Sequence, residues 1–407
     1  MDDTAPVGLR IKRHRERIGM SRPVLGGLVG RSAEWVKSVE TGKLQTPKLP
    51  VLLDIAKALG LSDLAELTGN GHAVSVQVYA GTEHPALRQV QAALTAYRMP
   101  VADRGEPQPV AHLAERLRLA WKVRHASPRH RSALGTLLPD LIRDAQRAAH
   151  RPGPDRRAAR AVLSGVYQLT DFFVAYQRDT TLVWLVADRA LEQAYEADDP
   201  NLIACATWAM VQALRDSGRW DEALSLISAG INTIDPYLER EQTPDDWRGI
   251  VGALEAEAAL IHARRGRHGD AWAAWDRADR WARALGPSYR HVQTSFSQPV
   301  QHANALTLGV DLRRSGEALR AARGLDAETI ISIPRRSRHL IEVARAHSQN
   351  SDRAAVLAEL DKAQRTAPET ISYNGYARDM LLDLRKSPPT GAAAAVRDLC
   401  GRVGLAA

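Results

Sequence analysis

Residues 20–43 have the sequence MSRPVLGGLVGRSAEWVKSVETGK, which contains the signals that begin and end two short helices. Ser21 and Ser32 each precede a helical stretch, where a serine side-chain oxygen can accept a hydrogen bond from a free backbone N–H. Gly30 and Gly42 follow these stretches, and glycine readily adopts the left-handed conformation that ends a helix. The spacing therefore predicts two short helices joined by a tight turn, which is a helix-turn-helix arrangement.

The flanking sequence predicts three more helices around this pair. Residues 8–18 are strongly basic and predict a first helix. A fourth helix is predicted over residues 47–60, and a fifth begins at the cap Ser62 and ends near Leu67. Five short helices within residues 1–69 are enough for a small core, so this segment is expected to form a domain of its own.

The order of these residues resembles that of the lambda-repressor-like (Xre-type) helix-turn-helix domains. The matching text is residues 20–43 together with LPVLLDIAKALGLS at residues 49–62, and the resemblance extends from Leu9 to Thr68. It implies binding to double-stranded DNA. It also implies a structural ion pair between Arg15 and Glu40, so Glu40 need not contact DNA.

One position departs from the family pattern. The family usually has glutamine at the second position of the second helix, and this chain has Arg22. Arginine keeps a contact with a DNA phosphate possible. The interaction that the glutamine usually makes with a base or with the DNA backbone is put in doubt.

The predicted third helix, residues 33–40, is the expected reading helix, because the major groove admits a helix and presents a distinct pattern for each base pair. With Val36 and Val39 in the core, the resemblance implies base contacts from Ala33, Glu34 and Ser38. Glu34 could accept from a cytosine amino group, and Ala33 could contact a thymine methyl group. The complete set of candidate DNA-binding residues, including those expected at phosphates, is Arg22, Arg31, Ser32, Ala33, Glu34, Trp35, Lys37, Ser38, Lys43 and Lys48.

An alternative is a degenerate helix-turn-helix that serves protein contacts. In that case Trp35 would be part of a packing surface, as a single large aromatic residue more often is.

The basic charge of the chain is concentrated in its N-terminal part. The net charge of +8 divides into +3 for residues 1–69, +8 for residues 70–160 and −3 for residues 161–407. Residues 9–48 contain 10 basic and 3 acidic side chains, a density that suits a polyanion such as nucleic acid. A basic face can also be merely solvated, so charge alone leaves both interpretations open.

The middle of the chain reads as a linker followed by a basic segment. Residues 70–83 lose helical periodicity and predict an extended strand or a tether, and one helix is predicted within the linker at residues 70–110. Residues 111–150 contain two predicted helices and are the most basic segment. They either add affinity for the DNA backbone or form a solvated helix face.

A weak self-similarity runs through residues 157–385. Small or apolar residues recur as triplets at offsets of four and seven, which places each triplet on one face of a helix. The first members of the triplets, 40, 48, 47 and 38 residues apart, are Val183, Ala223, Ala271, Ala318 and Val356. The pattern predicts tetratricopeptide-like helix pairs, slightly longer than the usual repeat of about 34 residues. A plain α-helical bundle is the alternative.

Stacked helix pairs present a concave surface on which such proteins bind ligands. The register of the triplets places these residues on the inner face: Gln168, Phe172, Tyr176, Trp208, Gln212, Arg215, Arg264, Thr307, Asp311, Arg345 and Gln349. The mixture of aromatic, amide and arginine side chains suits a short peptide or a small acidic metabolite. The candidate effector-binding residues are Tyr176, Trp208, Gln212, Arg215, Arg264 and Arg345.

The two-part arrangement resembles the peptide-sensing regulators of the Rgg and PlcR kind. It also resembles a set of regulators of about 400 residues from GC-rich Gram-positive bacteria, which looks closer. The expected fold is all-α, with a five-helix DNA-binding domain at residues 1–69 and an α-solenoid at residues 111–407. The expected function is a homodimeric transcriptional regulator that binds a palindromic operator and senses a ligand. The alternative is a protein-interaction scaffold with a vestigial helix-turn-helix.

The sequence contains no motif that predicts catalysis, so neither enzyme activity nor a cofactor is expected. Cys205 and Cys400 lie far apart with no Cys/His cluster, which argues against a disulfide framework and a structural metal. No apolar run is long enough to cross a bilayer, and the first thirty residues lack a secretory signal. A cytoplasmic protein without a membrane partner is expected.

Overall fold

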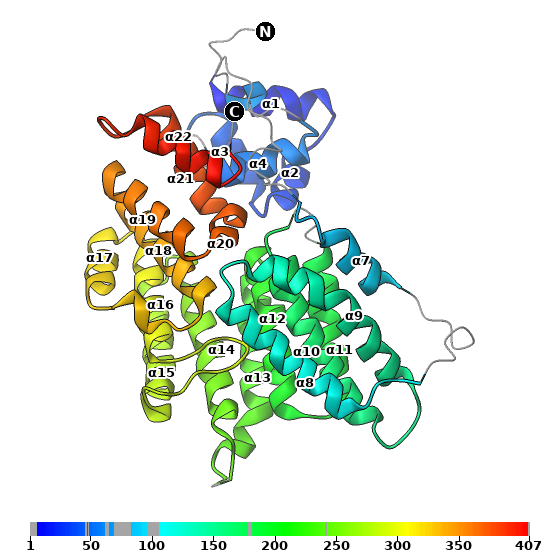
Figure 1. Cartoon of the computed structure of the whole chain (residues 1–407). Coiled ribbons are helices and arrows are strands. Elements are labelled where there is room, and N and C mark those ends of the chain that lie inside the picture. The colour runs from blue at the N-terminus through cyan, green and yellow to red at the C-terminus, as the bar shows by residue number, and fades with distance from the viewer. Residues whose placement is uncertain are drawn as a thin grey trace. The chain divides into compact units, whose positions relative to one another are not determined.

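The computed structural model describes residues 6–44, 47, 49–61, 65–68, 83–96, 106–177, 181–240 and 242–405. Every regular element within these ranges is a helix, as the sequence predicts (Figure 1). The chain divides into two compact units, residues 1–82 and residues 83–406, with Ala407 grouped with the first. No described helix combines the length and the apolar character that crossing a membrane requires.

The N-terminal unit contains short helices bounded by the predicted caps. Its helices are α1 (Val7–Arg17), α2 (Arg22–Leu28), α3 (Ala33–Glu40), α4 (Leu49–Ala58) and α5 (Ala65–Thr68). The side-chain oxygen of Ser21 accepts a hydrogen bond from Val24 N (3.4 Å), and that of Ser32 accepts one from Trp35 N (3.1 Å). Gly30 and Gly42 have φ values of +64° and +72°, which other residues rarely adopt. The predicted helix-turn-helix is confirmed. Ser62 lies outside the described residues.

One close backbone approach joins α1 to α3. A Cβ atom on Gly8 would lie 2.0 Å from the carbonyl oxygen of Val39, so only glycine allows α1 to pack at this distance. The core beneath this contact includes the buried side chains of Ile11, Leu25 and Val36. The amphipathic α1 thereby fixes the C-terminal end of α3.

The second unit is an array of longer helices. They are α7 (Leu87–Thr95), α8 (Val110–Ala126), α9 (His130–His150), α10 (Arg156–Val174), α11 (Thr181–Ala197), α12 (Pro200–Asp216), α13 (Trp220–Leu238), α14 (Asp245–Arg264), α15 (His268–Leu285), α16 (Gln298–Asp311), α17 (Ser315–Arg323), α18 (Ile333–Gln349), α19 (Arg353–Thr366), α20 (Pro368–Tyr373), α21 (Gly375–Lys386) and α22 (Ala393–Arg402), with a 3-10 turn at Ala327–Thr329.

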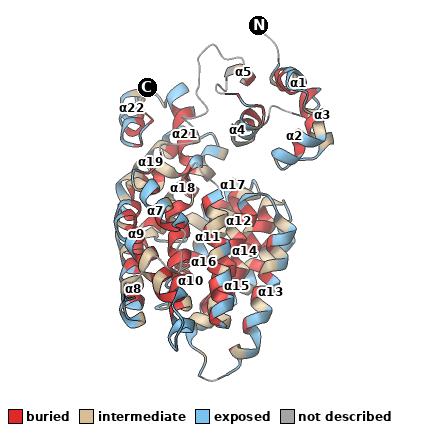
Figure 2. Cartoon of the chain, turned by 90° about the vertical axis from the view of Figure 1, so that its right-hand side faces the viewer, coloured by how far each residue is buried: buried red, intermediate tan, exposed pale blue. Residues whose placement is uncertain are grey.

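These helices stack as pairs. Consecutive helices from α10 to α19 pack as pairs, and the first helix of each pair also contacts the first helix of the next, from α10 through α12, α14 and α16 to α18. The predicted triplets fall on the second helices α11, α13, α15, α17 and α19, except that the last member of the fourth triplet, Leu325, lies two residues beyond the end of α17. Their buried faces point toward the neighbouring helices (Figure 2). This arrangement is an α-solenoid of tetratricopeptide-like pairs and not a plain α-helical bundle.

The two ends of the solenoid meet. Helix α8 contacts α18, and the His125 ring lies 2.9 Å from Ser332 Oγ and 2.7 Å from Val292 O. Glu369 of α20 accepts hydrogen bonds from Arg131 N (2.6 Å) and Ser132 N (3.2 Å) at the start of α9. The concave side is therefore closed across the unit by contacts between segments far apart in sequence.

Candidate functional site

Close packing in α2 sets the geometry of α3. A Cβ atom on Gly26 would lie 2.6 Å from the carbonyl oxygen of Arg31, and Arg31 N donates to Gly26 O at 2.7 Å. A Cβ atom on the neighbouring Gly27 would meet nothing within 4 Å. Gly26 alone lets the turn lie against α2, and this contact fixes the direction in which α3 leaves the turn.

Helix α3 turns its apolar side inward and its polar side outward. Val36, Val39 and Glu40 are buried, as predicted for the two valines. Glu34 and Lys37 are exposed and form an ion pair of 3.7 Å. The remaining candidate positions that are exposed or partly exposed are Arg31, Ser32, Ala33, Trp35, Ser38 and Lys43.

Trp35 has two roles in the unit itself. Part of its ring packs against the core, and the guanidinium of Arg31 lies 5.7 Å from the ring centroid. This contact orders Arg31 beside α3. Lys48 lies outside the described residues, and contact of all these residues with DNA stays a prediction.

The ion pair that the family resemblance implies is present. Arg15 Nε lies 2.5 Å from Glu40 Oε1, and Arg15 Nη2 lies 3.0 Å from Glu40 Oε2. Arg22 Nε also donates to Glu40 Oε2, at 2.7 Å. Burial acts to raise the pKa of Glu40, but the hydrogen bonds from Arg15 and Arg22 outweigh it and hold the pKa below its usual value.

This cluster explains the departure at Arg22. The Arg22 Nε donates to Glu40 and so links the start of α2 to the end of α3. The arginine side chain is 34% exposed, so its outer nitrogens remain available for the predicted phosphate contact.

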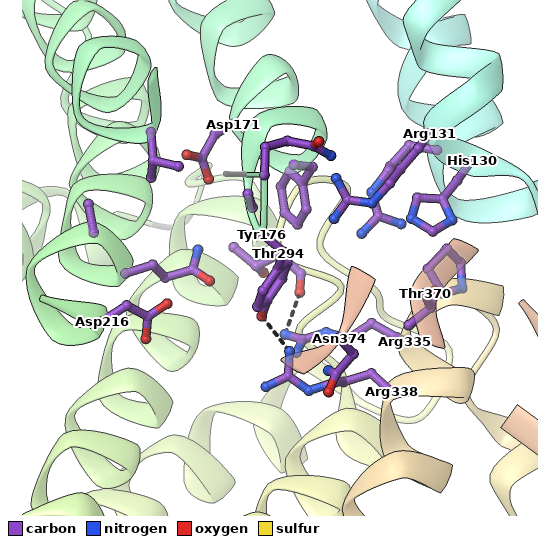
Figure 3. Close-up of a pocket in the computed structure, with 18 of the residues that line it drawn as sticks. His130, Arg131, Asp171, Tyr176, Asp216, Thr294, Arg335, Arg338, Thr370 and Asn374 are labelled. Carbon is purple, nitrogen blue, oxygen red and sulfur yellow. Dashed lines mark hydrogen bonds between the residues drawn. The ribbon is translucent and has the colours of Figure 1, made fainter. Parts of the chain in front are cut away.

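The second candidate site is a cavity of about 320 Å³ inside the solenoid. Its wall combines side chains from α8, α9, α10, α12, α18 and the α20–α21 region (Figure 3). Among the predicted effector-binding residues, Tyr176, Trp208 and Gln212 line it. A smaller cavity of about 70 Å³ adjoins it, shares Tyr176 and Gln212, and adds Arg215 and Arg264.

Three of the predicted effector-binding residues already have charged partners. Arg215, Arg264 and Arg345 belong to a ladder of ion pairs that crosses α12, α14, α16 and α18. Its nitrogen-to-oxygen distances are Arg215–Asp216 2.9 Å, Arg264–Asp216 2.9 Å, Arg264–Asp311 3.5 Å, Arg345–Asp311 2.9 Å and Arg345–Glu342 2.5 Å, with a further pair between Arg215 and Glu257. Arg345 lines neither cavity. The ladder binds successive repeats together, and ligand contact by these arginines stays a prediction.

Other residues predicted on the inner face form local contacts. Gln168 donates to Ser164 Oγ at 3.2 Å, and Gln349 donates to Val310 O at 2.8 Å. Phe172 lines the larger cavity and Thr307 the smaller one. Asp311 belongs to the ladder.

Two buried arginines of the basic segment line the larger cavity. Arg124 is 8% exposed, and its Nε and Nη1 have no hydrogen-bond partner. Arg131 donates through Nη1 to Phe173 O at 2.6 Å, whereas its Nε has no partner. Burial, followed by repulsion from Arg131 and Arg335, lowers the pKa of Arg124 to about 9. At neutral pH the guanidinium still carries its charge.

The opposite wall of the cavity carries carboxylates. Figure 3 shows Asp171 and Asp216 on one side and Arg131 on the other. Asp216 is paired with the ladder, but Asp171 is 5% exposed and its Oδ1 has no hydrogen-bond partner. Burial and the nearby charge of Asp216 raise the pKa of Asp171 to about 7, although Arg131 and Arg215 act in the other direction.

Sequence reasoning missed Arg124 and Arg131 as cavity residues. Neither interpretation of the basic segment, DNA affinity or a solvated face, applies to these two side chains, because both are buried. Arg124 lies three residues after the buried Trp121, and Arg131 lies three residues before the buried Leu134, so each is close to the apolar face of its helix. Arg118 has the same spacing from Trp121 and is exposed, so the spacing alone does not decide which arginine is buried. Other members of the segment, such as Lys122, are exposed.

No group of three or more His, Cys, Asp or Glu side chains in the described part of the chain is placed to hold a metal ion.

Comparison with known proteins identifies the first unit. Residues 6–68 match a family model described as "Helix-turn-helix domain". The N-terminal unit is a helix-turn-helix domain. No curated protein matches the chain.

Two solved structures are similar to the chain. The apo form of the competence regulator ComR from Streptococcus vestibularis is 19% identical, covering 74% of this chain and 98% of that chain with a TM-score of 0.31. ComR from S. thermophilus in complex with DNA and its signalling peptide ComS is also 19% identical, covering 69% of this chain and 94% of that chain with a TM-score of 0.25.

Proposed function

We propose that this protein is a sequence-specific DNA-binding transcriptional regulator, with a helical repeat unit that senses a small ligand or peptide and mediates dimerisation. The observation that carries the proposal is the helix-turn-helix domain, whose α3 buries Val36 and Val39 and leaves Glu34, Lys37 and Ser38 accessible. A homodimer would place two copies of α3 in successive major grooves, about 34 Å apart on a palindromic operator.

The contacts that close the solenoid give the ligand a means of control. The cavity lies between the first helices, which supply Arg124 and Arg131, and the later helix α18, which supplies Arg335 and Arg338. A ligand that contacts both sides binds the closed arrangement better than an open one, and it therefore shifts the population toward closure. Coupling of this kind is reciprocal, so operator DNA also changes the affinity for the ligand.

Gel shifts of promoter fragments at several salt concentrations test DNA binding. We expect affinity to fall steeply with salt, because phosphate contacts release counterions. Lys43→Ala should weaken binding to all sequences and reduce the salt dependence, whereas Ser38→Ala should relax preference at one base position and cost about 1–3 kcal/mol on the cognate site. Lys386→Ala, which removes an exposed charge from α21, is the control and should leave binding unchanged.

The alternative is a protein-interaction scaffold with a vestigial helix-turn-helix. It predicts DNA binding that is absent or insensitive to salt. Equal effects of the Ser38 and Lys43 substitutions on cognate and random DNA would contradict the assignment of α3 as the reading helix.

A further inference from the structure

The larger cavity contains positive charge that the protein itself does not neutralise. The inner-face arginines of the ladder are each paired with carboxylates, as described above. No carboxylate forms an ion pair with the guanidinium of Arg124, Arg131 or Arg335 among the residues that the structure describes; Arg335 donates only to Thr294 O, at 3.2 Å. Buried charges without partners are costly, so an anion in this cavity gains both the charge attraction and the unused N–H donors.

The shape of the donors favours a carboxylate. Guanidinium groups hold carboxylates through pairs of parallel hydrogen bonds, and two of the three guanidinium nitrogens of Arg124, Nε and Nη1, have no hydrogen-bond partner in the protein. The Arg124 guanidinium also lies 4.7 Å from the centroid of the Phe172 ring. This contact holds the Arg124 guanidinium in one orientation without using its N–H donors.

The other wall supplies the opposite charge. Asp171 is buried in the same cavity, and its Oδ1 has no partner. With its pKa raised to about 7, the Asp171 carboxyl is partly protonated at neutral pH, and a cation beside it favours the ionised form. The same cavity also has an apolar part, where the Phe172 and Trp208 rings stack with centroids 5.9 Å apart.

We propose that the cavity binds a small amino-carboxylate, with Arg124, Arg131 and Arg335 holding its carboxylate, Asp171 holding its ammonium group, and Phe172 and Trp208 contacting its hydrocarbon part. This rests on the proposed function, since it names the class of ligand that the repeat unit senses. The volume of about 320 Å³ lies at the small end of ligand pockets. It suits a molecule of amino-acid to dipeptide size.

Thermal shift and titration calorimetry on the full chain test this inference. Each standard α-amino acid is first added at millimolar concentration. The one that raises the melting temperature most is then compared with two matched probes, the same skeleton without its amino group and the same skeleton without its carboxylate. We expect the amino acid to bind about tenfold or more tightly than either probe, because each removes one charge-assisted contact.

Variants assign each end of the molecule. Arg124→Gln should weaken the amino acid and the carboxylate-only probe about tenfold and leave the amine-only probe unchanged, whereas Asp171→Asn should weaken the amino acid and the amine-only probe. Arg118→Gln, which removes an exposed arginine from the same helix α8, is the matched control and should behave as wild type. If Arg124→Gln does not fold, Arg335→Lys tests the carboxylate end of the ligand at a second arginine, because it keeps the charge and loses the parallel donors.

Three results overturn the inference: no α-amino acid raises the melting temperature, the amino acid binds no better than its matched probes, or the arginine and aspartate variants bind every probe as wild type does. Gel shifts on the same preparations separate this outcome from a failure of the proposed function. Salt-dependent DNA binding without amino-acid binding would contradict only the proposed ligand class and would leave the proposed DNA-binding function standing.

Discussion

Removal of the Glu40 carboxylate should unfold the helix-turn-helix unit locally without any involvement of DNA. The Glu40 side chain has no exposed surface, and Arg15 is 7% exposed, so Glu40→Ala removes the buried carboxylate and leaves the Arg15 guanidinium with only Met20 O and the exposed Glu16 as partners. Breaking a buried pair in this way costs about 3–5 kcal/mol. Arg22 adds little to this cost, because its side chain is 34% exposed and can turn to water.

The magnitude is large compared with the stability of a small domain. A loss of about 3–5 kcal/mol from a total of about 5–15 kcal/mol raises the ratio of unfolded to folded protein by a factor of about 150 to 5,000. The chain has two units, so whole-chain melting need not be a two-state process. Hydrogen exchange of peptides from α1 and α3 is therefore the appropriate measurement.

Two further variants separate charge pairing from other effects. The double substitution Arg15→Met with Glu40→Leu removes both charges and should restore exchange protection to nearly the wild-type level. Glu34→Ala removes an exposed carboxylate from the same helix and should change stability by less than about 0.5 kcal/mol. A loss below about 1 kcal/mol for Glu40→Ala, or a double variant no more stable than the single one, would refute the reasoning.

The stability that the Arg15–Glu40 ion pair contributes should also depend on pH. The pKa of Glu40 is lower in the folded protein than in the unfolded chain. The contribution of Glu40 to the free energy of unfolding is therefore fully present above its pKa in the unfolded chain, and it is lost as the pH falls through its pKa in the folded protein. Exchange protection of α3 should decrease with acid in the wild type and much less in the Arg15→Met, Glu40→Leu variant.

Three other predictions follow from packing and protonation. Gly26→Ala should destabilise the N-terminal unit by about 1–3 kcal/mol because its Cβ would overlap the Arg31 carbonyl, whereas Gly27→Ala should stabilise it by up to about 1 kcal/mol; denaturation of both variants checks the difference, and equal effects would contradict the packing argument. Glu369→Ala removes the acceptor for two backbone N–H groups at the start of α9 and should cost about 1–3 kcal/mol, seen as faster hydrogen exchange there; unchanged exchange would argue against closure through this contact. Burial lowers the pKa of His125 to about 3, so between about pH 6.5 and pH 3 acid should destabilise the wild type relative to His125→Gln by up to about 1.4 kcal/mol per pH unit; parallel pH profiles of the unfolding midpoint would show that this ring does not titrate on unfolding.

The sequence by itself determined the local structure of this protein. Ser21, Gly30, Ser32 and Gly42 each act on backbone groups within a few residues, so their spacing was sufficient to place α2 and α3. The family resemblance over residues 9–68 was sufficient to pair Arg15 with Glu40. The small-residue triplets located the second helix of each repeat, because a helical face repeats within one element.

The tertiary structure alone decided how the larger cavity is closed. Its wall joins α8 and α9 to α18, and the contact between His125 and Ser332 spans 207 positions in the sequence. Closure over such a distance depends on small rotations between successive repeats that add up along the solenoid, and no local pattern encodes their sum. The same summed curvature decided which arginines of the basic segment became buried beside Asp171 and which, such as Arg118, remained on the surface.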